Sequence, residues 1–270
     1  MYEQFYGFHA SPFNITPDPR FLFFSGRHQE AYDHLLFGIT ERKGFIQLTG
    51  EVGTGKTTLC RALLEALDPK FKTALILNPC MSWPQMLRTI LVELGQKPGR
   101  NDRVYWLEQL NLFLLEQVDQ GNDVVLVIDE AQDLSTELLE QVRLLSNLET
   151  DRQKLLQIVL IGQPELKRML ENRALRQLRQ RITVRYHLTP LDYSETEEYI
   201  EHRMRVVGAN GAPSFSPWAL RRIYRYSGGV PRLINAACDK ALLCGYVEGD
   251  SFLRHRHLRR AIRELDGHFR

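Results

Sequence analysis

The eight residues GEVGTGKT, Gly50 to Thr57, constrain the fold of this chain more than any other stretch. They match the pattern G-x-x-x-x-G-K-[ST]. An apolar run, GFIQLT at 44–49, precedes them, and TLCRALLEAL at 58–67 follows with the spacing of a helix. Glycine is the residue that tolerates the backbone angles of a tight loop, and it weakens an ordinary helix. The stretch therefore predicts a strand, a glycine loop and a helix in direct succession.

The loop has the chemistry of a phosphate site. Glycines allow consecutive N–H groups to point at one anion, and the helix N-terminus adds a positive dipole end. Lys56 can reach the β- and γ-phosphates of a nucleotide, and the Thr57 hydroxyl can hold Mg²⁺. A turn that merely joins strand to helix is the alternative. We expect the nucleotide to contact the whole segment: Gly50, Glu51, Val52, Gly53, Thr54, Gly55, Lys56, Thr57 and Thr58.

Two acids end a second apolar run, DVVLVIDE at 123–130. Burying carboxylates there is costly unless they act at the carboxyl edge of the sheet, where open α/β folds bind ligands. We expect Asp129 to organise the Mg²⁺ shell and Glu130 to polarise the attacking water. Acids at a strand end can also be helix caps. The chain has no guanine-reading Asn-Lys-x-Asp string, which favours ATP.

Strands and helices alternate up to about residue 190. Apolar runs at 73–78, 155–162 and 182–188 predict three further strands, and helical spacing recurs near 28–42, 83–95, 103–120 and 135–149. Strands separated by helices predict a parallel sheet covered on both faces. The fold class expected is α/β, a P-loop NTPase with a five-stranded parallel sheet.

The pattern then becomes helical. SETEEYIEHRMRVVG opens with a Ser-x-x-Glu capping box, Ser194 and Glu197, and helices near 217–226, 231–247 and 255–265 follow without a further strand. We therefore expect three parts: an aromatic and proline-rich arm with one helix at 1–43, an α/β nucleotide-binding subdomain at 44–190, and a small all-helical lid at 191–270.

Composition and cysteine spacing restrict the classes of protein to which the chain can belong. The four cysteines show no metal spacing or disulfide framework, and the chain shows neither a signal peptide nor an apolar run of membrane-spanning length. We expect a cytoplasmic protein without a membrane span. From Lys167 onward there are 20 Lys and Arg against 11 Asp and Glu, a net +9 in a chain of net +2. Such a surface suits either an anionic partner or simple solvation.

The two motifs with helices after them resemble an AAA+ ATPase. The stretches PFNITPDPRFLFFSGRHQEA, LTGEVGTGKTTLCRALL, LSNLET, LLQIVLIGQPEL, LRQLRQRI and SGGVPRLIN are similar to the GspA/ExeA group of bacterial AAA+ ATPases. The group includes type II secretion assembly ATPases and MshM-like ATPases of type IV pili. The resemblance covers nearly the whole chain.

The resemblance implies roles for further positions. Gln163 would be the polar sensor near the γ-phosphate, although many relatives carry Asn or Thr there and a cap before Pro164 is the alternative. Arg232, in SGGVPRLIN, would reach from the lid onto the phosphates. SGRHQEAYDHL would lie where relatives cover the adenine, with no reader identified.

The resemblance also implies an arginine finger, which reaches a neighbouring subunit's nucleotide. LRQLRQRI supplies Arg176, Arg179 and Arg181. A guanidinium suits this role because it is always charged and forked. We favour Arg181, which directly precedes the last strand, and then Arg179. Plain surface charge is the alternative for each.

Three functions follow as hypotheses. The first is an ATP- and Mg²⁺-dependent homo-oligomeric protein that drives assembly of a bacterial envelope machine, held at the inner membrane's inner face through secretion or pilus proteins. The second, less favoured, is a DNA-associated ATPase of the transposition or replication-loader kind, suggested by the basic residues LRHRHLRRAIR at 253–263. The third is a nucleotide-gated scaffold with negligible turnover.

Overall fold

The computed structural model describes residues 1–270 except 15–17, 100–101, 150–152 and 268–270. Contacts within the chain divide it into two units, each described by itself. The sheet unit comprises Gln29–Gly50 and Leu59–Leu188. The lid unit comprises Met1–His28, Glu51–Thr58 and Thr189–Arg270. The expected boundaries near 43 and 190 stay a prediction.

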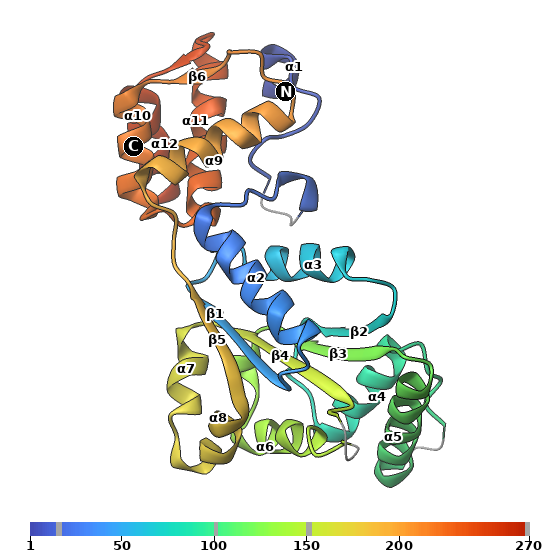
Figure 1. The fold of residues 1–270 in the computed structure, drawn as a ribbon. Helices are drawn as coiled ribbons and strands as arrows, with labels where there is room; N and C mark the ends of the chain where they lie inside the picture. The colour runs from blue at the N-terminus through green and yellow to red at the C-terminus, as the bar shows by residue number, and fades with distance from the viewer. Residues whose placement is uncertain (15–17, 100–101, 150–152, 268–270) are drawn as a thin grey trace. The chain divides into compact units, whose positions relative to one another are not determined.

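The described residues of the sheet unit form a sheet of five strands, and every neighbouring pair is parallel. Their order is β2-β3-β4-β1-β5 (Figure 1), which confirms the predicted five-stranded parallel sheet. Because all strands run the same way, their carboxyl ends share one edge, with β1, β4 and β3 as neighbours there. The strands are β1 (Phe45–Gly50), β2 (Phe71–Ile76), β3 (Asp123–Ile128), β4 (Leu156–Gly162) and β5 (Ile182–Leu188).

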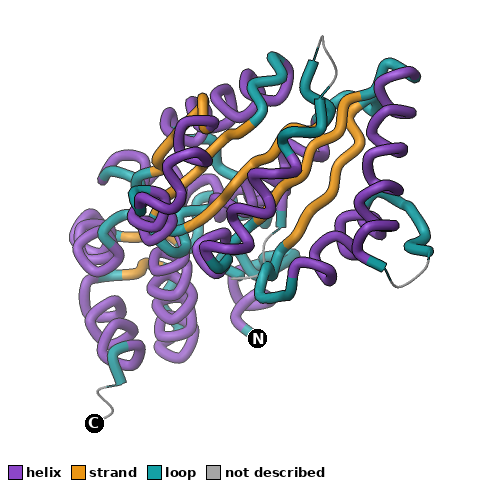
Figure 2. Tube along the Cα trace, turned by 90° about the horizontal axis from the view of Figure 1, so that it is seen from below, coloured by secondary structure: helices purple, strands orange, loops and turns teal. Residues whose placement is uncertain are grey.

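Helices cover both faces of this sheet (Figure 2). They are α2 (Gly26–Thr40), α3 (Lys56–Ala66), α4 (Trp83–Glu93), α5 (Arg103–Asp119), α6 (Thr136–Leu145), α7 (Pro164–Leu170) and α8 (Arg176–Arg181), of which α2 and α3 each begin in the lid unit. Among the described residues before β5 there are also three short 3-10 turns, at Pro19–Phe21, Ala131–Asp133 and Arg173–Leu175. Helix α6 ends at Leu145, four residues before the expected end.

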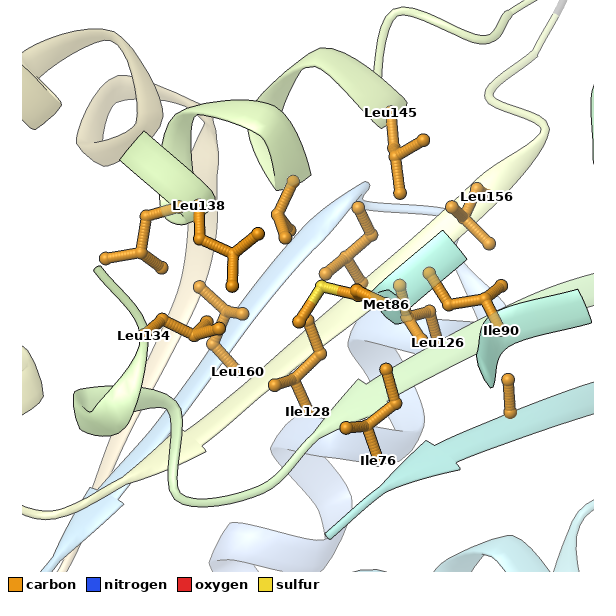
Figure 3. Packing of buried hydrophobic residues seen from close by; sticks show 14 of the residues in the cluster. Ile76, Met86, Ile90, Leu126, Ile128, Leu134, Leu138, Leu145, Leu156 and Leu160 are labelled. Carbon is orange, nitrogen blue, oxygen red and sulfur yellow. The ribbon is translucent and has the colours of Figure 1, made fainter. Parts of the chain in front are cut away.

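The alternation of β3 explains why both faces must be covered. Val124, Leu126 and Ile128 lie in one apolar cluster with side chains from α4, α5 and α6. Val125 and Val127 lie in another, with side chains from α2 and α3. Successive strand residues point to opposite faces, so an unbroken apolar run needs two coverings. Figure 3 shows the first cluster, where residues of α4 lie against strand residues.

The lid unit has its own core. Helices α9 (Tyr193–Val206), α10 (Pro217–Ser227), α11 (Pro231–Glu248) and α12 (His255–Leu265) enclose it. The N-terminal arm, which includes α1 (Tyr2–Tyr6), contributes Phe8, Phe13 and Phe21 to this core. Arg203 of α9 holds the arm in place, since its Nε donates to the Pro12 carbonyl at 2.6 Å and its guanidinium lies 4.6 Å from the Phe21 ring centre.

Two details of the lid differ from the sequence prediction. The cap of α9 is Asp192, not Ser194: its carboxylate accepts from Glu195 N at 2.9 Å, and the Glu195 carboxylate accepts from Asp192 N at 2.9 Å. An aspartate and a glutamate three residues apart thus form the same pair of reciprocal hydrogen bonds that was predicted for Ser194 and Glu197, two residues earlier in the chain. The lid also contains a strand pair, β6 (Ser214–Phe215) with β7 (Phe252–Leu253), too short to give a sequence pattern.

Candidate functional site

The glycine loop follows β1 and opens directly into α3, as predicted. Gly53 and Gly55 have φ angles of 81° and 96°, which side-chain-bearing residues rarely adopt. Lys56 is the first residue of α3 and is only 7% exposed. The loop therefore has the backbone that an anion-binding loop requires.

Hydrogen bonds within the loop fix its shape. The Lys56 amine and the Thr54 hydroxyl both donate to the Glu51 carbonyl, each at 2.9 Å. The remaining predicted nucleotide contacts differ in exposure: Glu51 and Val52 are exposed, whereas Thr57 and Thr58 are partly buried in the first turn of α3.

Arg232 of α11 is brought onto this loop. Its backbone N–H donates to the Gly53 carbonyl at 3.2 Å. A Cβ built on Gly53 would lie 2.5 Å from the Arg232 Cβ, so glycine is required for this approach. The turn before α11 is equally tight, because a Cβ on Gly229 would lie 1.8 Å from the Leu191 carbonyl oxygen. The predicted lid arginine thus lies beside the phosphate loop, with its side chain exposed.

His28, at the start of α2, also holds the loop, and sequence reasoning did not identify it. Its Nε2 lies 3.0 Å from the Thr54 carbonyl oxygen and its Nδ1 lies 2.8 Å from the Ser25 hydroxyl. A carbonyl only accepts, so Nε2 carries the proton and Nδ1 accepts from Ser25. Burial lowers the pKa of His28, which favours this neutral form. The signal available was a histidine inside the stretch SGRHQEA.

The two predicted acids lie at the end of β3. Asp129 is 3% exposed, and its backbone N–H donates to the Ile76 carbonyl at 2.8 Å, which continues the pairing of β3 with β2. One carboxylate oxygen of Asp129 accepts from Glu130 N at 2.9 Å. Glu130 has φ 49° and ψ 40°, a left-handed conformation costing a side-chain-bearing residue about 1 kcal/mol or more. Strain of this kind is concentrated at functional sites.

Two glutamines hold the Glu130 carboxylate. The side-chain amides of Gln163 and Gln132 donate to its Oε2 at 3.1 Å and 2.7 Å. The Gln132 carbonyl oxygen in turn accepts from Gln163 N at 3.0 Å. Gly162 permits this, since a Cβ there would lie 2.8 Å from the Gln132 oxygen. Gln163 was predicted and Gln132 was not, although Gln132 stands two residues after Glu130 in the motif DEAQ.

The three finger candidates lie elsewhere, on α8. Arg176 is exposed and Arg179 is partly buried. Arg181 donates to the Ser146 hydroxyl at the end of α6. Among the described residues, no hydrogen bond or ion pair connects these arginines to the glycine loop or to the group of Glu130, Gln132 and Gln163.

The residues fit a nucleotide and its Mg²⁺ on chemical grounds. The loop supplies glycine backbone and a buried amine, and a buried carboxylate of the kind that Mg²⁺ prefers ends β3. The structure forms two groups: loop, His28 and Arg232 in the lid unit, and Asp129, Glu130, Gln132 and Gln163 in the sheet unit. Within the sheet unit, β1 ends at Gly50, directly before the loop in sequence, and β3 ends directly before the acids.

Sequence comparisons identify relatives of this chain. Residues 39–170 match the family model described as an AAA domain. The chain is 46% identical over 269 residues to general secretion pathway protein A of Aeromonas hydrophila, an alignment that covers 99% of the chain and 49% of that protein. The chain therefore spans about half the length of this relative. Among the described residues, no helix has the length and apolar character needed to cross a membrane.

Comparisons of structure find the same fold. The Cdc6p structure of Pyrobaculum aerophilum matches with a TM-score of 0.71 and 19% identity over 94% of this chain and 70% of that one. The ORC2 structure of Aeropyrum pernix matches with a TM-score of 0.69 and 19% identity, covering 95% of this chain and 72% of that one. The RuvB structure of Thermotoga maritima matches with a TM-score of 0.58 and 16% identity, covering 90% of this chain and 69% of that one. At these identities the matches concern fold alone. By fold and sequence, the chain belongs to the AAA+ P-loop proteins and, within them, to the GspA/ExeA type.

Proposed function

We propose that the chain binds ATP with Mg²⁺ and hydrolyses it. The observation that carries this proposal is the bond of both Gln163 and Gln132 to the Glu130 carboxylate, which leaves Oε1 for a water. Glu130 accepts a proton from water as the water oxygen attacks the γ-phosphorus. The bond from that phosphorus to the β–γ bridging oxygen breaks, and ADP and phosphate leave.

The other residues bind and orient the nucleotide. Lys56 and Arg232 contact its phosphates, and the loop N–H groups surround them. Thr57 and Asp129 hold Mg²⁺, which when bound neutralises charge on the phosphates. Gln163 keeps the Glu130 carboxylate in one orientation, and Gln132 assists it.

We infer that His28 orients one N–H of the loop. In a trans peptide the C=O and N–H point in opposite directions, so fixing the Thr54 carbonyl also fixes the Gly55 N–H. Replacing His28 with leucine is expected to weaken ADP binding about tenfold, since one charge-assisted hydrogen bond is worth about 1.5 kcal/mol or more. Isothermal titration measures this.

The conservative variant His28→Gln tests whether a donor is what matters. Its amide can donate to the same carbonyl, so it is expected to recover most of the lost affinity. If His28→Leu binds ADP as tightly as the wild type, or if both variants bind equally weakly with equal melting temperatures, the orienting role is wrong.

We further propose that ATP turnover drives assembly of an envelope secretion machine at the inner face of the inner membrane. The support is the 46% identity to general secretion pathway protein A. A type IV pilus of the MSHA kind is the related machine that the sequence resemblance allows. The partners are secretion or pilus assembly proteins.

A cellular experiment tests this role. In the bacterium that encodes the chain, the protein is replaced by its Glu130→Gln variant, and export of an enzyme that uses type II secretion is measured. Export is expected to fall to the level of cells without the protein, while pilus assembly is scored in parallel. Normal export and normal pili in the variant strain would rule out both envelope roles.

We propose that hydrolysis requires a second copy, which supplies Arg181 or Arg179 as the finger. Specific activity should then rise with protein concentration, because an arginine finger contributes a factor of about 1,000 or more. A mixture of two variants tests this directly. Arg181→Ala retains the general base Glu130 and Glu130→Gln retains the arginine, so a mixed oligomer can form a complete site. Activity restored by mixing two inactive variants supports the finger, and activity independent of dilution contradicts it. Arg176→Ala and Arg179→Ala, mixed in the same way, identify which arginine acts.

A further inference from the structure

One face of the lid unit is formed by arginines of two packed helices. On α10, Trp218, Arg221, Arg222 and Arg225 recur at intervals of three and four and so share one stripe. The opposite stripe, with Ala219, Leu220 and Ile223, is buried in the lid core. Helix α10 contains no acidic residue.

Helix α12 continues this face. Its buried stripe is His257, Leu258, Ala261 and Ile262, which leaves His255, Arg259 and Arg263 exposed on the outside. The two helices pack against each other, and Arg222 Nη1 lies 3.4 Å from His255 Nε2, so the stripes join. We call the combined surface the basic face; it comprises Trp218, Arg221, Arg222, Arg225, His255, Arg259 and Arg263.

The other two arginines of α12 form ion pairs with acidic residues. Arg256 pairs with Asp250 at 2.9 Å and with Glu248 at 3.1 Å, and Arg260 pairs with Glu264 at 3.3 Å. Among the residues that the structure describes, no ion pair involves an arginine of the basic face. Its charge is therefore available to an anionic partner.

Two large rings of the lid unit are exposed, and one of them, Trp218, lies on the basic face. Trp218 is 68% exposed and Phe252 is 42% exposed. The Arg221 guanidinium lies 5.3 Å from the Trp218 ring centre, and the Arg254 guanidinium lies 5.7 Å from that of Phe252. A tryptophan ring beside basic side chains suits the boundary between water and a bilayer, where the ring lies among the headgroups and the cations on their phosphates.

We propose that the basic face docks the lid onto an anionic phospholipid bilayer, with the arginines on headgroup phosphates and Trp218 in the interface. Nucleic acid is the other anionic partner that such a surface could bind, and the experiment below distinguishes it from the bilayer. The inference rests on the proposed secretion role, since assembly of an envelope machine occurs at a membrane.

Trp218 provides a direct reporter of docking. The chain has three tryptophans, and Trp83 and Trp106 are buried in the sheet unit. Vesicles of phosphatidylglycerol and phosphatidylcholine are expected to shift the emission to the blue, and brominated phosphatidylcholine in them to quench it. Vesicles of phosphatidylcholine alone should do neither, and Trp218→Phe should abolish both signals without preventing sedimentation with the anionic vesicles.

Charge is tested separately. Each arginine near an anionic bilayer strengthens binding roughly fivefold, so Arg221→Gln/Arg225→Gln/Arg263→Gln should weaken vesicle binding about 100-fold. The control Lys167→Gln/Arg168→Gln/Arg173→Gln removes the same charge from exposed positions of the sheet unit and should bind normally. Added salt should weaken wild-type binding, because the contacts are exposed.

Three results would overturn the proposal: no binding to anionic vesicles, equal loss in the control variant, or tight binding to 30-nucleotide DNA with no quenching by brominated lipid. The last would favour nucleic acid as the partner. ATP hydrolysis without vesicles is expected to be unchanged in the arginine variant. Failure to bind vesicles with normal hydrolysis and export therefore counts against docking alone, whereas absent hydrolysis counts against the proposed function.

Discussion

Replacing Glu130 with glutamine is expected to lower kcat for ATP hydrolysis about 100-fold or more, because a general base contributes that much or more to a rate. ATP affinity should change little, since the phosphates are bound by the glycine loop and not by this carboxylate. The amide keeps the size of Glu130 and its oxygen can still accept from Gln132 and Gln163. Phosphate release and binding of a fluorescent ATP analogue measure the two quantities.

The matched control is Glu108→Gln, which makes the same change at an exposed position of α5. It should hydrolyse ATP at the wild-type rate. Turnover that survives in Glu130→Gln would remove the general base from the mechanism. A wild-type chain that binds ATP but does not turn it over would instead favour the nucleotide-gated scaffold.

Sequence patterns predicted the parts of this site that depend on local chemistry. The glycine loop and the acids of β3 each follow an apolar strand, and parallel strands bring such segments to one edge. The lid arginine was predicted from a family motif. The structure adds that its backbone N–H is bonded to the Gly53 carbonyl.

The contacts that were missed join residues distant in sequence or lack a distinctive pattern. His28 and Thr54 are 26 residues apart, and a histidine near a helix start carries no periodic signal. In the sequence, nothing distinguishes Gln132 from a surface glutamine. Only the fold brings it to Gln163, which is 31 residues further along the chain. The sequence prediction placed the cap of α9 two residues late, because Ser194 and Glu197 also match the capping-box pattern. In the structure the box is formed by Asp192 and Glu195.

Gly53→Ala is expected to weaken nucleotide binding at least tenfold. Two costs combine at this position. The φ angle of 81° disfavours any side chain, by about 1 kcal/mol. The new methyl would also lie 2.5 Å from the Arg232 Cβ, an atom fixed to the backbone of α11 that cannot rotate away. Loop and lid arginine must therefore separate, and the phosphates lose the guanidinium as well as the loop geometry.

Gly211→Ala separates the two costs. Gly211 belongs to the same unit and has a similar φ of 84°, but a Cβ there meets no atom within 4 Å. Both variants should lose thermal stability through backbone strain, Gly53→Ala the more because of its added clash, and only Gly53→Ala should also lose affinity for ADP and ATP. Titration of each nucleotide, together with melting curves, provides the comparison. If both variants bind nucleotide alike, the contact between Gly53 and Arg232 does not hold the phosphate loop in its binding conformation, and Arg232 must act on the nucleotide by another route.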